Sequence, residues 1–321
     1  MQQSVTRING DVRRVWEELS RNALRSLKEI SQTLHMPYSR VRRITDYLVA
    51  EGIIRGYRTI FNPLKLGLRH SALAFFRTNP SEPHIRRKLF EIPNIEKVFV
   101  LSGTYSLMAL LKCSDRDSYE ETLSKLDKII AKSKFKQSDY VSIIKTYKEE
   151  GIPFSHDNNE NNNPPKLDKK DLMILRTIYY QKTDENRTLP IPSTEIAKIL
   201  DISQPSVHRR LKKMISQGVI LSVRADPSYF DYNKDFFLIA IKADLRNSRH
   251  IVEFLIKNDK VKSLYRVGRE YQFRAIVSTS TIKDLQKFLD RLYEVSGVID
   301  TNTQIVFSEK DSGIINFPNV G

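Results

Sequence analysis

The chain of 321 residues contains one cysteine, Cys113, and no long hydrophobic run. A single cysteine excludes an intrachain disulfide, and this favours a reducing, cytoplasmic compartment. A transmembrane helix needs about 18 or more consecutive apolar residues, and the N-terminus also lacks the apolar segment of a signal peptide. We therefore expect a cytoplasmic protein that has no membrane partner.

The sequence also has few of the patterns that catalysis or metal binding requires. It has no glycine-rich phosphate loop, and its six histidines and single cysteine show no metal-ligand spacing. No nucleophile lies at a usable spacing from a base. We expect no catalytic residue, no metal and no cofactor, and we interpret Cys113, at the end of an apolar run, as a buried thiol.

Positive charge is abundant and unevenly distributed. The formal net charge is +15, and residues 1–69 hold 13 Lys and Arg against 6 Asp and Glu, while residues 166–226 hold 12 against 7. These two segments account for +12 of the excess. A solvated basic surface would spread its charge more evenly, so that the concentration indicates a polyanionic partner, with nucleic acid the leading candidate.

The same two segments contain an internal repeat. Residues 37–54 return as residues 203–220, with Val41 matching Val207 and Gly52 matching Gly218 at one offset of 166. In each copy apolar residues recur at helical spacing opposite a basic face, and a glycine ends the pattern. A shorter helical pattern precedes each copy across a tight turn, which predicts two helix-turn-helix units.

A strand-like run with further basic residues follows each helix and is interpreted as a wing. The next segment of each half then follows the order strand, helix, strand, strand, helix, strand, which is the ferredoxin-like pattern. The predicted fold is α+β, with two winged helix-turn-helix domains alternating with two ferredoxin-like βαββαβ domains. Each ferredoxin-like sheet is expected to have one open face, and these faces are expected to pair, within one chain or between two chains.

The predicted boundaries follow from these patterns and from an Asn-rich, aperiodic linker. They are 1–66 for the first winged helix-turn-helix, 67–150 for the first ferredoxin-like domain, 151–165 for the linker, 166–230 for the second winged helix-turn-helix, 231–311 for the second ferredoxin-like domain and 312–321 for a tail. Residues 181–192 form a polar insertion that the first copy lacks. The sequence does not indicate its role.

In this order the motifs resemble the Lrp/AsnC family of transcriptional regulators in duplicated form. The residues that carry the resemblance include Leu167-Asp168, Glu195-Ile196, Gly218-Val219-Ile220, Gly52-Ile53-Ile54 and Gly103-Thr104-Tyr105. The resemblance implies a double-stranded DNA partner, a small-molecule effector, and a homodimer or larger homo-oligomer. It places effector binding near Gly103, Tyr105, Gly268 and Tyr271, although both turns lack the Asp that the family carries there.

The basic helices supply the candidate DNA contacts. In the first copy we expect Tyr38, Ser39, Arg40 and Arg43 near the bases or the nearby backbone, and Arg42, Arg55 and Arg58 on phosphates. In the second copy we expect Gln204, Ser206, His208 and Arg209 near the bases, and Lys212, Lys213 and Arg224 on the backbone. Because the two helices differ, we expect them to read unlike half-sites.

An enzymatic function is the alternative. Residues 265–271 resemble siroheme decarboxylases, which are built on a similar duplicated plan but carry a histidine where this chain has Arg269. A carboxylate-rich substrate would also attract basic residues. All six histidines lie outside the strand-turn-strand regions where such an enzyme would need one; they are His35, His70, His84, His156, His208 and His250.

Overall fold

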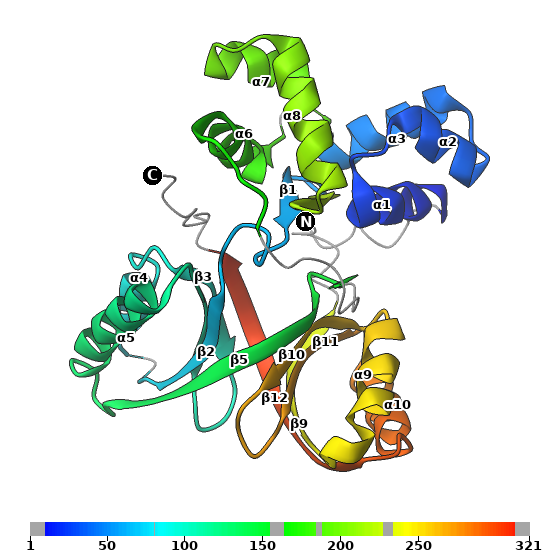
Figure 1. Cartoon of the computed structure of the whole chain (residues 1–321). Helices are drawn as coiled ribbons and strands as arrows, with labels where there is room; N and C mark the ends of the chain where they lie inside the picture. The colour runs from blue at the N-terminus through cyan, green and yellow to red at the C-terminus, as the bar shows by residue number, and fades with distance from the viewer. Residues whose placement is uncertain (1–9, 80, 155–163, 184–187, 227–233, 312–321) are drawn as a thin grey trace. The chain divides into compact units, whose positions relative to one another are not determined.

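The computed structural model describes residues 10–79, 81–154, 164–183, 188–226 and 234–311 (Figure 1). Within this structure the chain forms two compact units. One combines the chain up to Leu66 with residues 164–233, and the other combines residues 67–163 with 234–319. Each unit therefore draws on both halves of the chain.

The first unit, which we call the head unit, contains two helix-turn-helix motifs. The predicted helices are present, and each basic helix ends where the repeat predicted. The elements of the first half are α1 (Gly10–Asn22), α2 (Leu27–Leu34), α3 (Tyr38–Ala50) and β1 (Gly56–Phe61). Those of the second half are α6 (Lys169–Tyr179), β7 (Tyr180–Lys182), α7 (Ser193–Leu200), α8 (Gln204–Ser216) and β8 (Ile220–Ala225).

Matching residues shape the turns of the two motifs. His35 and Asp201, which occupy equivalent positions, both adopt the left-handed conformation, with φ of 52° and 50°. His and Asp tolerate this region better than most side chains do. Gly52 and Gly218, with φ of 66° and 69°, follow the ends of α3 and α8. The two motifs therefore turn in the same way, as the shared spacing predicted.

The two strands predicted as separate wings instead pair with each other. β1 and β8 are antiparallel, with Arg58 opposite Arg224, and β7 pairs with the other edge of β1. Residues in or directly after the helices of one half also bond to strands of the other. Ala23 N donates to Val223 O at 2.5 Å, and Thr59 Oγ1 donates to Ile178 O at 2.5 Å. The sequence pattern predicted the strands but not their partners.

The second unit, which we call the barrel unit, contains strands and helices in the predicted order. The first half contributes β2 (His70–Arg77), α4 (Pro83–Leu89), β3 (Ile95–Leu101), β4 (Leu107–Cys113), α5 (Arg116–Ile130), β5 (Gln137–Glu149) and β6 (Ile152–Pro153). The second half contributes β9 (Asp235–Ala243), η3 (Leu245–Asn247), α9 (Ser248–Lys257), β10 (Val261–Val267), β11 (Phe273–Thr279), α10 (Ile282–Tyr293) and β12 (Val298–Asp311).

The α+β class is confirmed, but the prediction of two separate ferredoxin-like sheets needs correction. The strand orders β3-β4-β2-β5 and β10-β11-β9-β12 join edge to edge, β12 to β3 and β5 to β10, and thereby close one barrel (Figure 1). The physical reason is that an edge strand exposes unpaired backbone groups, and closure removes the edges. The pairing that was left open between one chain and two occurs within one chain.

Both halves fill the barrel. Helices α4 and α5 lie outside the strands of the first half, and α9 and α10 lie outside those of the second (Figure 1). The interior cluster takes Phe99 and Leu110 from the first half and Leu238, Tyr265 and Ile276 from the second.

Cys113 is buried, as predicted, and burial raises the pKa of its thiol. No helix in the described part of the chain is long and apolar enough to cross a bilayer.

A buried ionic cluster lies across the joins between the halves. Lys112 Nζ is 2.7 Å from Glu96 Oε2 and 2.8 Å from Glu149 Oε1. Tyr265 Oη, from the second half, donates to Glu149 Oε1 at 3.2 Å. Burial raises the pKa of Glu96 although Lys112 opposes the shift. Lys97, also buried, pairs with Glu150 and with Glu309 of the second half.

We expect Lys112→Met to destabilise the protein by about 3 to 5 kcal/mol at neutral pH, because it leaves two buried carboxylates without their cation. The raised pKa of Glu96 favours its neutral acid, so that the loss should be smaller at about pH 5 than at about pH 8. Urea unfolding followed by circular dichroism measures both effects. Lys125→Met, which removes an exposed pair on α5, is the control. Equal midpoints for the two variants would contradict the assignment.

Candidate nucleic-acid interface

The first candidate reading surface is the exposed side of α3. Val41, Ile44 and Leu48 are buried beneath it. The five predicted contact residues of this helix are all exposed; they are Tyr38, Ser39, Arg40, Arg42 and Arg43. The amphipathic pattern of the sequence therefore places them on one accessible surface.

Two of these arginines have acidic partners within the head unit. Arg40 forms an ion pair with Asp11 of α1, and Arg42 Nε lies 3.2 and 3.1 Å from the two carboxylate oxygens of Asp46. The hydrogen bond that Arg42 donates to Asp46 raises the pKa of Arg42. Among the described residues, no acidic group lies within 4.0 Å of Arg43. Arg40 and Arg42 are thus held in position, whereas Arg43 is open to a ligand.

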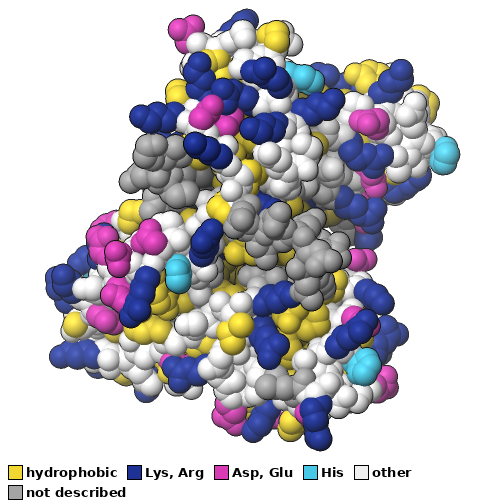
Figure 2. Space-filling view, viewed as in Figure 1, with side chains coloured by type: hydrophobic (Ala, Val, Ile, Leu, Met, Phe, Trp, Pro, Cys, Tyr) yellow, Lys and Arg dark blue, Asp and Glu magenta, His cyan; other side chains and the backbone are white. Residues whose placement is uncertain are grey.

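The second candidate reading surface is the exposed side of α8. Gln204, His208, Arg209, Lys212 and Lys213 are exposed, and Ser206 is half-buried. Figure 2 shows Lys and Arg side chains gathered over this helix. In the described ranges no carboxylate lies within 4.0 Å of the three basic side chains, Arg209, Lys212 and Lys213. Their charges are available to phosphate oxygens.

The neighbouring Arg210 has a different role, which the sequence analysis missed. Its Nη1 lies 2.7 Å from Asp168 Oδ2 and 2.6 Å from Asp171 Oδ1, and Asp171 is buried. Asp168 caps the N-terminus of α6, so that Arg210 fastens α8 to α6. The signal was the helical spacing itself, since one step along a helix turns a side chain by about 100°.

The three strand residues predicted on phosphates belong to one ribbon and not to two wings. Arg55 is exposed just before β1, whereas Arg58 and Arg224 are half-buried. Arg58 and Arg224 lie directly opposite each other on β1 and β8. Residues at a facing position of an antiparallel pair project from the same face of the ribbon, so both arginines belong to one face of it.

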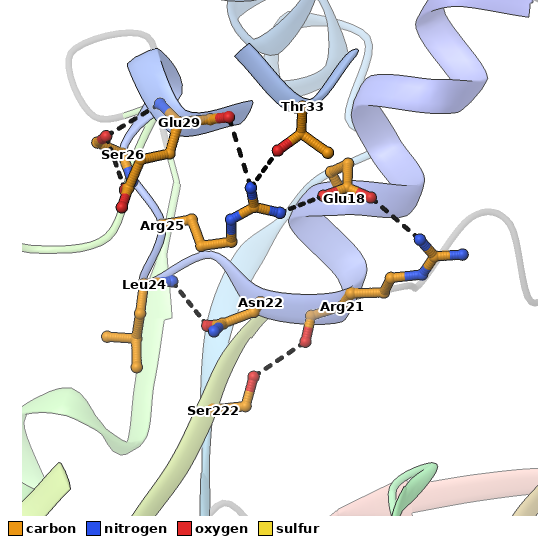
Figure 3. Close-up of polar contacts among 9 residues, drawn as sticks. All are labelled: Glu18, Arg21, Asn22, Leu24, Arg25, Ser26, Glu29, Thr33 and Ser222. Carbon is orange, nitrogen blue, oxygen red and sulfur yellow. Dashed lines mark hydrogen bonds and ion pairs between the residues drawn. The ribbon is translucent and has the colours of Figure 1, made fainter. Parts of the chain in front are cut away.

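We call the helix-turn-helix motif of α1, α2 and α3 the first head, and that of α6, α7 and α8 the second head. Some of the positive charge of the first head is paired with carboxylates inside it. Glu18 is buried on α1, and its carboxylate binds Arg21 at 3.0 Å and Arg25 at 2.6 Å (Figure 3). Arg25 also donates to Thr33 and to the backbone oxygen of Glu29 on α2. Arg25 therefore joins α1 to α2, and a net charge read from the sequence overstates what this head offers to DNA.

The predicted effector turns lie at the barrel and make local bonds. Tyr271 Oη donates to Asp300 Oδ2 at 2.7 Å, which raises the pKa of Tyr271. The ring of Tyr105 packs against that of Phe75, with 5.8 Å between the ring centroids. A side chain at Gly103, which has a φ of 93°, would lie 3.0 Å from Gln304 Nε2. A Cβ at Gly268 would meet only Ile144, at 3.6 Å.

The residue at the siroheme-decarboxylase position is engaged across the join of the halves. Arg269 Nη2 lies 2.6 Å from Asp139 Oδ1 on β5. Five histidines are exposed in the structure, which are His35, His70, His84, His208 and His250. His156 lies outside the described residues. In the described part of the chain, no group of three or more His, Cys, Asp and Glu side chains is arranged to hold a metal ion.

Comparison with known proteins relates the chain to two domain families. Residues 190–220 match a winged helix-turn-helix DNA-binding family, and residues 237–315 match the Lrp/AsnC ligand binding domain. The HTH-type transcriptional regulator FL11 of Pyrococcus abyssi is 30% identical over 118 residues, which cover 36% of this chain and 77% of that protein. The HTH-type transcriptional regulator LysM of Sulfurisphaera tokodaii is 28% identical over 141 residues, covering 44% of this chain and 94% of that protein.

A solved structure matches nearly the whole length. The crystal structure of the siroheme decarboxylase NirDL aligns with a TM-score of 0.62 at 12% identity, covering 93% of this chain and 91% of that one. At such low identity the likeness shows the fold alone.

Adjacent arginines on α8 should separate into two phenotypes. Arg210→Met leaves the buried Asp171 without its cation, so that we expect a loss of about 3 to 5 kcal/mol in unfolding free energy. Arg209→Met should leave the melting temperature within about 1 °C of the wild type, because Arg209 has no acidic partner among the described residues, but it should weaken binding to duplex DNA. Calorimetry measures the stability of the two variants, and a gel shift measures their binding to duplex DNA. The opposite assignment of phenotypes would refute the orientation of α8.

Proposed function

The chain belongs to the Lrp/AsnC family of HTH-type transcriptional regulators, and we propose that it reads double-stranded DNA sequence-specifically through two heads carried on one chain. The observation that carries this proposal is the set of exposed cations on α8 without an acidic partner in the described structure, namely Arg209, Lys212 and Lys213. The exposed side of α3 supplies the reading surface of the other head, which is the first along the chain, and β1 and β8 join the two.

In this proposal α3 and α8 each enter a major groove. The N-terminal side chains of such helices reach base edges, while basic residues farther along neutralise phosphates. Gln204 has the geometry to bind adenine through two hydrogen bonds, and Arg43 and Arg209 have that geometry for guanine. The paired Arg58 and Arg224 would face the backbone between the two half-sites.

The heads are proposed to read unlike half-sites. Arg43 and Arg209 occupy equivalent positions and are the same residue. Two other equivalent positions differ, because His208 replaces Arg42 and Gln204 replaces Tyr38. A homodimer of single units presents two identical helices, but one chain with two different helices presents the equivalent of a heterodimer. Carrying both heads on one chain also raises the effective concentration of the second head to about millimolar.

An effector response and a homo-oligomer follow from the resemblance and remain predictions. The domain family matched by residues 237–315 is named for ligand binding, which supports an effector site in the barrel unit. An effector that used Tyr271 would have to replace its bond to Asp300.

Light scattering measures the number of chains in the oligomer, since one chain has a mass of 37.4 kDa.

The second candidate function is that of a siroheme decarboxylase-like enzyme. It is favoured by the likeness in fold over 93% of the chain. The two functions are distinguished by adding siroheme and duplex DNA separately. A shift of the Soret band with no gel shift on DNA would favour the enzyme, whereas a gel shift with no Soret change supports the regulator.

The salt dependence of DNA affinity tests the proposed phosphate contacts. We expect Lys212→Ala and Lys213→Ala each to reduce the slope of log affinity against log salt by about 0.9, because each contact releases about one counterion. Lys125→Ala, which removes an exposed lysine of α5 in the barrel unit, is the matched control and should leave the slope unchanged. Slopes that are identical for all three variants would remove α8 from the interface.

A further inference from the structure

The insertion of the second half, residues 181–192, has a structural role that its sequence did not indicate. It lies between α6 and α7, and the structure describes residues 181–183 and 188–192 of it, which we call the brace. The brace bonds to the first head and not only to its own. A segment that the first copy lacks therefore joins the two heads.

The outgoing arm of the brace extends the shared sheet. Gln181 and Lys182 pair with Tyr57 and Gly56 of β1, and Thr183 donates to Arg55 O at 3.1 Å and to Ile54 O at 2.9 Å. A Cβ at Gly56 would lie 2.7 Å from the backbone oxygen of Gln181, which is closer than real contacts allow. Glycine is therefore required at position 56 by the approach of the brace.

The returning arm packs into the first head. Leu189 packs against the hydrophobic cluster of the first head. Tyr57, which is fully buried, donates from its hydroxyl to Thr188 O at 2.9 Å. Burial, with a smaller contribution from Asp46, raises the pKa of Tyr57, so that its phenol keeps the proton that it donates. The arm is thus fixed both by apolar packing and by a buried hydrogen bond.

Thr188 of the brace is linked by hydrogen bonds, through Asp46, to Arg42 on the exposed side of α3. Thr188 Oγ1 donates to Asp46 Oδ1 at 2.7 Å, and Asp46 accepts from Arg42 Nε at 3.2 and 3.1 Å. An exposed pair four residues apart on a helix contributes little by itself. Here the carboxylate is also held by a residue from the other half of the chain, so that the arginine loses less freedom when it binds.

We propose that the brace is a specificity element, in which Thr188 holds Asp46 and Asp46 positions Arg42 toward a base edge, in place of the phosphate contact predicted from the sequence. A segment of the second half would then determine how the first head reads DNA. The inference rests on the proposed function and adds a route from one head to the other. Thr188 is a positioning residue, because it acts on DNA through Asp46 and Arg42.

The test compares base preferences of four single variants and one double variant. Fragments selected by the wild-type chain from a random duplex library give a preference at each position, and each variant is then measured on the same library. Arg42→Ala should flatten the preference at the positions that Arg42 reads. Thr188→Val keeps the shape of the side chain and removes the hydroxyl, and it should flatten the same positions and lower affinity about threefold to tenfold.

Three further measurements make the test specific. The double variant of Thr188 and Arg42 should behave as Arg42→Ala alone, because the two residues act in series. Thr177→Val is the matched control, since in the described ranges the hydroxyl of Thr177 bonds only to Met173 O within α6, and its preferences should match the wild type. Gly56→Ala, which displaces the brace sterically, should reproduce the effect of Thr188→Val.

The outcomes separate the inference from the function beneath it. If Thr188→Val has the same preferences as Thr177→Val, or if Arg42→Ala changes no preference, the brace does not set specificity and the inference is overturned, while DNA reading stands. If the wild-type chain retains no duplex at low ionic strength, the proposed function itself is lost.

Discussion

Backbone pairing between strands from opposite halves of the chain is the constraint on which the rest of the structure depends. In the head unit β1 pairs with β8, and in the barrel unit β5 pairs with β10 and β12 with β3. An isolated half would leave each of these strands with an exposed edge. Because each of these three pairings joins a strand of one half to a strand of the other, neither half completes its sheets alone.

Side-chain packing follows the same exchange. The hydrophobic cluster of the first head includes Val223 and Ala225 from the second half, and the barrel interior mixes residues of both. Buried charges lie at the joins as well, where Glu149 and Tyr265 meet. Such charges contribute little net stability, but a wrong register would leave them unpaired, which disfavours alternative pairings.

The basic residues divide between the interior of the head unit and its surface. Arg25 and Arg210 bind buried carboxylates and hold helices together. Arg43, Arg209 and Lys212 point outward with no acidic group within 4.0 Å in the described part of the chain. The net charge of +15 is thus only partly available to a polyanion, and the share that is available lies on the two helices that the repeat identified.

Sequence patterns predicted the local structure well. The helical period located α3 and α8, and Gly52 and Gly218 marked their ends. Apolar, strand-like runs located the strands of the barrel. These signals are local, because each depends on residues within a few turns or a single strand.

The rest depended on contacts between distant residues. An apolar, strand-like run does not specify which edge it joins, so that two open sheets were predicted where one barrel forms. Adjacent Arg209 and Arg210 looked alike until Asp171 was placed beside the second. Thr188 and Asp46 are 142 residues apart, and no pattern in one strand or helix relates them.

The central claim is that one chain presents two different reading heads as a single body. A hydroxyl-radical footprint on a selected duplex, together with the native mass of the complex, tests it most directly. The account predicts two protected segments of unlike sequence for each bound chain, on one face of the duplex. A single protected segment for each chain, or two identical segments that require two chains, would contradict it.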